Sequence, residues 1–126
     1  MAAHYNLGVL LEKKGDLAGA KAEYLKAIEF DPRHVSAHIN LGVLLNDKGD
    51  LAGAEAAFLT AIEIDPRHVG AHQSLAALLA NNRSDWAGAE KEFLRILEID
   101  PAHAVAKQFL PLVRENMRVV RENMRK

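Results

Sequence analysis

The sequence predicts an all-α fold, a solenoid of stacked antiparallel helix pairs, on three observations. Residues 4–34 are repeated at 38–68 and again at 72–103, with a period of 34 and then 34 to 35 residues. Within a copy, apolar residues recur three and four apart, which is the spacing of a helix with one buried face. The hexapeptide GDLAGA, written SDWAGA in the third copy, interrupts each copy near its middle, at residues 15–20, 49–54 and 84–89. Each copy is therefore predicted to be two helices joined by a tight turn.

The hexapeptide predicts the turn itself. Gly15 and Gly49 can adopt the left-handed backbone that ends a helix, and the aspartate after each can accept the free amide hydrogens that begin the next one. In the third copy the turn reads NNRSD, which is one residue longer and has no glycine. We expect Asn81 or Asn82 to take the left-handed conformation there.

Two further glycines, Gly19 and Gly53, lie near the start of the second helices and have no turn to make. Glycine costs a helix about 0.5–1 kcal/mol relative to alanine, so Gly→Ala at either position is expected to stabilise the fold by that amount.

Asp-Pro pairs separate the copies. The residue before proline avoids helical geometry and proline suits a helix start, so a new helix is expected at each pair. The predicted organisation is one continuous domain made of three repeats and a C-terminal capping helix, at residues 1–34, 35–68, 69–103 and 104–126.

The period and several fixed positions resemble the tetratricopeptide repeat (TPR) family. The matching positions are a Leu-Gly or Leu-Ala pair in the first helix, a small residue and an aromatic in the second, and a closing proline: Leu7, Gly8, Leu41, Gly42, Leu75, Ala76, Ala20, Ala54, Ala89, Tyr24, Phe58, Phe93, Pro32, Pro66 and Pro101. Two features depart from the family pattern, because histidine replaces its usual tryptophan at 4, 38 and 72 and a glycine lies inside each second helix. The resemblance implies a right-handed superhelix in which each unit buries its neighbour.

The resemblance also implies a concave groove lined by the first helix of each repeat. The groove residues expected to contact a peptide are Tyr5, Asn6, Val9, Ile39, Asn40, Val43, Gln73, Ser74 and Ala77. Asn6 and Asn40 each offer a donor and an acceptor that can pair with a peptide backbone, although Ser74 breaks the series. The alternative is that these are surface amides inherited from a repeated unit.

Some family members grip carboxylate-ended chaperone tails with converging lysines, an arginine and asparagines. Only Asn40 matches those positions here, since Tyr5, Val9, Gly70 and Ser74 occupy the others, so we expect no binding of such tails.

Histidines four apart, such as His34 with His38, lie on one helix face, but no third ligand accompanies them and no metal is predicted. The acidic residues read as helix caps or solvated side chains and no nucleophile motif is present, so neither catalysis nor a cofactor is expected.

Composition limits the remaining classes. Residues 1–103 carry 10 Lys and Arg against 15 Asp and Glu, and residues 104–126 carry 6 against 2, so an acidic body precedes a basic tail. Such a body repels nucleic-acid backbones, and no apolar run approaches the ~18 residues that span a bilayer. The chain has no cysteine, which fits a reducing compartment, and we expect a cytoplasmic protein.

The tail begins like a fourth repeat and then departs from it at Pro111. Its near half, from Phe109 to Val113, is expected to cap the third repeat. The apolar seam continues through Met117, Val120 and Met124, which are expected to be exposed and to support a weak homodimer.

The function predicted from the sequence is a scaffold that binds a peptide or helix of a partner protein in its groove. The alternative is a structural or self-associating TPR module with no dedicated ligand, either a fragment of a longer array or a designed repeat protein.

Overall fold

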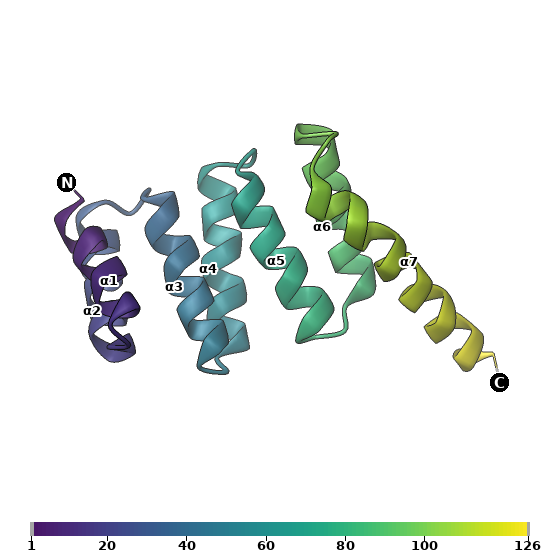
Figure 1. The fold of residues 1–126 in the computed structure, drawn as a ribbon, viewed down its shortest axis with the longest axis horizontal. Coiled ribbons are helices and arrows are strands. Elements are labelled where there is room, and N and C mark those ends of the chain that lie inside the picture. Colours follow the sequence, from purple (N-terminus) through teal and green to yellow (C-terminus); the bar gives the residue numbers. More distant parts are fainter. Residues whose placement is uncertain (1, 126) are drawn as a thin grey trace. The chain divides into compact units, whose positions relative to one another are not determined.

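The structure, a computed structural model, describes residues 2–125 and contains helices but no strand within them. The helices are α1 to α7 (Figure 1), at Ala3–Lys13, Leu17–Phe30, Val35–Asp47, Leu51–Ile64, Val69–Asn81, Trp86–Ile99 and Ala104–Met124. The all-α class and the pairing of helices across short turns are confirmed. The chain divides into two compact units, an N-terminal unit of residues 1–66 that holds α1 to α4 and a C-terminal unit of residues 67–126 that holds α5 to α7.

Each turn inside a repeat combines a left-handed residue with a capping aspartate. Gly15 and Gly49 have φ values of +84° and +86°, as expected for glycines that end a helix. The next aspartate accepts a hydrogen bond from the amide three residues on, at 2.9 Å for Asp16 with Gly19, for Asp50 with Gly53 and for Asp85 with Gly88. The turn that GDLAGA predicts is therefore present in all three repeats.

The third turn corrects the expectation for Asn81 and Asn82. Asn81 is the last residue of α5, and Asn82 has φ −107°, so neither is left-handed. Ser84 takes that role with φ +51°. It directly precedes the capping Asp85, as Gly15 precedes Asp16, so the extra residue lengthens the turn without moving the left-handed position relative to the cap.

The start of the first helix in a repeat also differs from the expectation. Pro32 lies in a turn, and α3 begins three residues later at Val35. The N-cap is His34, whose ring Nδ1 accepts a hydrogen bond from the Ala37 amide at 3.0 Å. His68 and His103 cap α5 and α7 in the same way, at 3.1 and 3.2 Å. These three histidines have a structural role.

In the first two helix pairs, the core places an aromatic ring against a glycine. A Cβ added to Gly8 would lie 2.6 Å from Tyr24 Cε1, and one added to Gly42 would lie 2.5 Å from Phe58 Cε1. Both rings are almost fully buried. The glycine of each Leu-Gly pair is thus required by the aromatic residue of the second helix.

The second-helix glycines Gly19 and Gly53 have less room for a side chain than the sequence analysis expected. A Cβ on Gly19 or Gly53 would collide with the carboxylate of its own N-cap, Asp16 or Asp50. That carboxylate would have to turn away and release its hydrogen bond, which opposes the gain in helix propensity. The predicted stabilisation by Gly→Ala therefore omitted a cost that the structure reveals.

In the C-terminal unit, α7 packs against α6 and runs as one helix through Pro111. Leu110 and Val113 of α7 are buried, whereas Phe109 is 41% exposed. Arg114 pairs with Glu90 of α6 at 2.9 Å.

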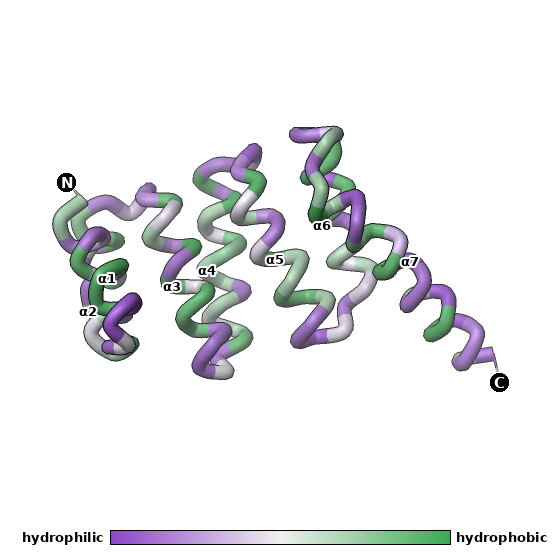
Figure 2. The backbone as a smooth tube through the Cα atoms, viewed as in Figure 1, coloured by the Kyte–Doolittle hydropathy of each residue, from purple (hydrophilic) through white to green (hydrophobic). Residues whose placement is uncertain are grey.

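Figure 2 shows that the second half of α7 is mostly hydrophilic, and Arg118 there bridges Glu115 and Glu122, each at 2.5 Å. The bond to Arg118 holds the pKa of Glu115 below its usual value.

Candidate functional site

The predicted groove residues of the N-terminal unit lie on α1 and α3. Asn6 and Val43 are exposed there, and Val9 and Ile39 are partly buried. Tyr5 and Asn40 are also partly buried, because they contact each other: Asn40 Nδ2 donates to the Tyr5 hydroxyl at 3.2 Å.

Asn40 belongs to a polar network that includes the core. Its Nδ2 also lies 3.5 Å from the hydroxyl of Tyr24, and that hydroxyl donates to Glu12 Oε1 at 2.7 Å. Burial and the bond to Glu12 raise the pKa of Tyr24 above its usual value, so the phenol stays neutral and remains a donor. The ring centroid of Tyr5 lies 4.8 Å from that of His34, so the tyrosine also contacts the N-cap residue of α3. The Asn40 amide nitrogen is therefore engaged within the unit, and its oxygen is the group suited to accept from a peptide.

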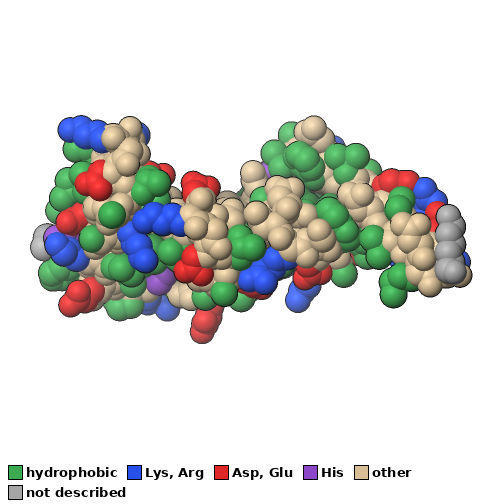
Figure 3. Space-filling model, turned by 90° about the horizontal axis from the view of Figure 1, so that it is seen from below, with side chains coloured by type: hydrophobic (Ala, Val, Ile, Leu, Met, Phe, Trp, Pro, Cys, Tyr) green, Lys and Arg blue, Asp and Glu red, His purple; other side chains and the backbone are tan. Residues whose placement is uncertain are grey.

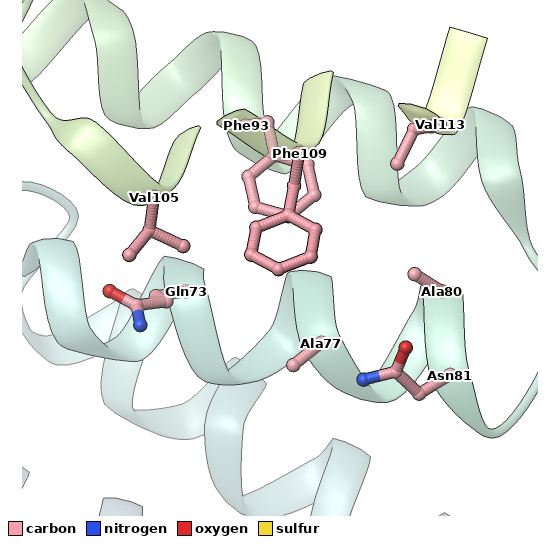
Figure 4. Close-up of a pocket in the computed structure, with 8 residues that line it drawn as sticks. All are labelled: Gln73, Ala77, Ala80, Asn81, Phe93, Val105, Phe109 and Val113. Carbon is pink, nitrogen blue, oxygen red and sulfur yellow. The ribbon is translucent and has the colours of Figure 1, made fainter. Parts of the chain in front are cut away.

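A hollow in the C-terminal unit brings together residues from all three of its helices. It has a volume of about 170 Å³ and is lined by Gln73, Ala77, Ala80, Asn81, Phe93, Val105, Phe109 and Val113 (Figure 4). We call it the α5–α7 pocket. The phenyl rings of Phe93 and Phe109 stack with centroids 6.3 Å apart and planes 13° apart, and they form one wall. Gln73 and Asn81 place amides along α5, eight residues apart, on either side of Ala77.

The size and lining of this pocket limit what it can hold. Sites for small molecules and cofactors usually enclose ~300–1,000 Å³, whereas an apolar cavity of about 150 Å³ admits a ring the size of benzene. The α5–α7 pocket is therefore matched to one apolar side chain. The two amides can orient the backbone that carries that side chain.

Sequence reasoning found part of this pocket and missed the rest. Gln73 and Ala77 were predicted groove residues and line it, while Ser74 does not. Val105 and Phe109 were not predicted as site residues. A signal was present, because the tail begins like a fourth repeat and Phe109 follows Ser74 by 35 residues, the repeat spacing at that point.

The predicted self-association residues lie on the second half of α7 and differ in exposure. Val120 and Met124 are 44% and 81% exposed. Met117 is only partly exposed, contrary to expectation, because it lies with Val120 beside Trp86 at the start of α6, around a shallow hollow of about 270 Å³. Part of the second half of α7 therefore lies against the start of α6, whereas the sequence analysis expected it to be exposed.

The histidines and acidic residues form no metal centre within residues 2–125, where no three potential ligands cluster. His38 is buried and its Nε2 lies 2.9 Å from the Pro32 carbonyl oxygen. His4 and His72 instead meet glutamates, His4 with Glu23 at 2.6 Å and His72 with Glu92 at 2.5 Å. The hydrogen bond to His4 lowers the pKa of Glu23.

Across the described part of the chain, no helix has the length and apolar character needed to cross a membrane.

Comparison with solved structures shows the fold. The first TPR of Spaghetti (RPAP3), solved with the HSP90 peptide SRMEEVD, is 20% identical, with coverage of 91% of this chain and 93% of that one and a TM-score of 0.82. The NMR structure of the first TPR domain of human RPAP3 is 21% identical, with coverage of 95% and 93% and a TM-score of 0.82. A crystal structure of MamA is 23% identical, with coverage of 92% and 63% and a TM-score of 0.81.

Sequence comparison gives the family. No curated protein sequence matches the chain. The tetratricopeptide repeat family model matches residues 5–69, just over half of the 126 residues. With the repeat period and the helix pairs described above, this match shows that the chain belongs to the tetratricopeptide repeat family.

Proposed function

We propose that this protein is a protein-interaction module that binds a peptide of a partner protein, with one apolar side chain of that peptide in the α5–α7 pocket. The observation that carries the proposal is the pocket itself, an apolar hollow bounded by the Phe93 and Phe109 rings and flanked by two amides. Its lining includes Gln73 and Ala77, which the family resemblance places on the peptide-binding face. The proposed activity is binding rather than catalysis, and the proposed compartment is the cytoplasm.

The chemistry of the peptide follows from the side chains around the pocket. None of its eight lining residues is charged. A buried carboxylate would lose its hydration there without gaining a cationic partner. The peptide is therefore expected to present a neutral aliphatic or aromatic side chain, and its backbone is expected to bond the amides of Gln73 and Asn81.

The expected peptide differs from the HSP90 peptide in the Spaghetti structure, because the sequence of that peptide, SRMEEVD, is rich in acidic residues. At 20% identity that likeness concerns the fold alone. Family members hold such tails with lysines, an arginine and asparagines, and of those positions only Asn40 matches here, while the others hold Tyr5, Val9, Gly70 and Ser74. We therefore expect SRMEEVD to be a weak ligand or none.

A peptide-display screen against the 126-residue chain tests the proposal, with the selected peptides measured by fluorescence anisotropy. Ala77→Leu should fill the pocket from an exposed position on α5 and weaken binding about tenfold or more. Ala56→Leu, the same change at an exposed position of α4, is the matched control and should leave affinity unchanged. Equal affinity of the Ala77→Leu variant and the wild type would refute the pocket as the site.

The amides of the N-terminal unit have a separate test. If they hold a peptide backbone, Asn6→Ala combined with Asn40→Ala should weaken binding by about 1–3 kcal/mol. Because Asn40 also bonds Tyr5 and Tyr24, each variant needs a denaturation midpoint beside its affinity. Unchanged affinity in a folded double variant would show that these two amides do not hold the peptide.

The second candidate function is self-association through the second half of α7. The exposure of Val120 and Met124 favours it. Sedimentation of the full chain beside a version that ends at Arg114 tests it. A full chain that stays monomeric at high micromolar concentration would refute self-association, and packing against α6 would then be the only role of α7.

A further inference from the structure

We propose that the α5–α7 pocket selects an aromatic side chain, carried by an extended segment of the ligand, over an aliphatic side chain of the same size. This selectivity rests on the proposed function, which places one apolar side chain in the pocket without choosing between the two classes. Three features of the pocket carry it: the phenyl rings of the wall, the alanines opposite them and the spacing of the two amides.

The wall of the pocket presents a flat aromatic surface. The planes of the Phe93 and Phe109 rings are 13° apart, and Figure 4 shows the Phe109 ring face-on, in front of Phe93 and nearer to α5. Phe93 is 4% exposed and Phe109 is 41% exposed, so Phe109 is the ring that an occupant would meet. A second aromatic ring can lie on such a face in an offset stack, which an aliphatic side chain cannot form.

Packing between helices does not account for an aromatic residue at position 109. At the repeat spacing, the same position holds Asn40 in the second repeat and Ser74 in the third. α3 packs against α2 with Asn40 at this position, as α7 packs against α6 with Phe109. The phenyl ring is therefore an addition specific to α7, and its exposed part is available to a ligand.

The face of α5 opposite the rings carries small side chains where the second repeat carries larger ones. Ala77 stands at the position of Val43, and Ala80 stands at the position of Asn46. These smaller side chains help to leave a hollow of about 170 Å³, close to the apolar cavity of about 150 Å³ that admits benzene. One phenyl group is therefore matched to the space between the alanines and Phe109.

The two amides favour an extended backbone in the occupant. Gln73 and Asn81 lie four residues before and four residues after Ala77 on α5, so their Cα atoms are about 12 Å apart along the helix axis. An extended chain rises roughly 3.3 Å per residue, so about four residues span this distance. A five-residue extended segment can thus bond both amides with its backbone and place its central side chain in the pocket. A helix has already paired its own backbone groups and would leave the amides unused.

Two blocked pentapeptides test the preference for an aromatic side chain: acetyl-Ser-Ala-Phe-Ala-Ser-amide, and the same peptide with cyclohexylalanine in place of its Phe. The saturated ring of cyclohexylalanine is at least as apolar, so burial of apolar area alone would favour it or make the two peptides equal. Stacking on Phe109 reverses this order, and we expect the Phe peptide to bind the 126-residue chain about twofold to tenfold more tightly. Chemical shifts of the ¹⁵N-labelled protein, followed to about 10 mM peptide, give both dissociation constants.

Variants of the protein locate the source of the preference. Phe109→Leu keeps an apolar side chain but removes the ring face, so the preference for the Phe peptide should disappear or reverse. Hydrophobic side chains lie among charged ones on the surface that Figure 3 shows, so a control for contact with an exposed phenyl ring elsewhere is needed. Phe30→Leu is that control, because Phe30 is 74% exposed on α2 in the other unit, and it should leave the preference unchanged. Circular dichroism of each variant checks that it remains helical.

A shorter probe, acetyl-Phe-amide, tests the extended backbone. Gln73→Ala combined with Asn81→Ala should weaken binding of the Phe pentapeptide about threefold or more and leave binding of acetyl-Phe-amide unchanged, since the shorter probe lacks the flanking residues. Equal effects on the two probes would overturn the extended arrangement.

The outcomes separate this selectivity from the proposed function. Equal or tighter binding of the cyclohexylalanine peptide, at a site that Ala77→Leu blocks, would overturn the selectivity while the pocket remained a binding site. A preference for the Phe peptide that survives Phe109→Leu would also overturn the selectivity, since the aromatic wall would not be its source. Absence of saturation by either pentapeptide to about 10 mM would count against the selectivity and the pocket together.

Discussion

Replacing Gly42 by alanine should destabilise the N-terminal unit, although alanine is the better helix former. The new Cβ would lie 2.5, 2.8 and 3.1 Å from three atoms of the Phe58 ring, well inside ordinary contact distance. The ring is 1% exposed, so other atoms of the unit surround it. Overpacking of a core costs about 1–3 kcal/mol, and the severe overlap favours the upper part of that range. The gain in helix propensity is ~1 kcal/mol, so we expect a net loss of about 1–2 kcal/mol.

The third repeat carries the methyl group that Gly42 lacks. Ala76 stands where Gly42 stands in the second repeat, and Phe93, at the position of Phe58, is 4% exposed and stacks on Phe109. The cost of Gly42→Ala should therefore depend on the ring. In a double-mutant cycle, Phe58→Leu should remove most of it.

Urea denaturation with two probes measures the effect. Circular dichroism reports helices throughout the chain, whereas the single tryptophan, Trp86, reports the C-terminal unit. Gly42→Ala should lower the midpoint seen by circular dichroism, and Ala76→Gly provides a comparison in the other unit, with a loss of ~1 kcal/mol from helix propensity. A rise in stability on Gly42→Ala, or an equal loss in the Phe58→Leu background, would refute the packing argument.

Three further changes have defined expectations. Ser84→Gly should stabilise the protein by about 0.5–1 kcal/mol, since φ +51° costs serine more than glycine; a lower thermal midpoint would contradict this. Phe58→Tyr should raise the free energy of unfolding by about 0.5–1.5 kcal/mol, because Oδ1 of Asn46 is buried without a hydrogen-bond partner among the described residues. In the first repeat the equivalent residues, Tyr24 and Glu12, form a hydrogen bond. A loss of stability would show that the new hydroxyl does not reach Asn46. Glu23→Gln should lower the stability of the protein above pH 4.5, the ordinary pKa of a glutamate carboxyl. The difference in urea midpoint between the variant and the wild type should shrink as the pH falls through the lowered pKa of Glu23 in the folded state. A pH-independent difference would show that the bond to His4 does not cause the pKa shift.

The sequence predicted those parts of the fold that depend on local rules repeated three times. The apolar spacing predicted the helices, and each GD or SD step predicted a turn closed by an aspartate cap. The histidine caps were missed because Ser, Thr, Asp and Asn are the usual residues at this position, although a neutral imidazole nitrogen is also an acceptor. The left-handed residue of the third turn was assigned to Asn81 or Asn82 by propensity, whereas its distance from the capping Asp85 determines it.

The candidate site was less predictable, because it depends on which helix lies beside α5 rather than on the sequence of α5. Gln73 and Ala77 follow from the family pattern, but an alanine face becomes a pocket only when large side chains stand opposite it. Phe109 supplies that wall because α7 replaces the serine of the third repeat with an aromatic one repeat later. The same helix carries Arg114, Glu115 and Arg118 farther along, and Arg114 and Arg118 each pair with a glutamate at the surface. α7 thus covers α6 with one face and, through Phe109, gives the α5–α7 pocket its aromatic wall.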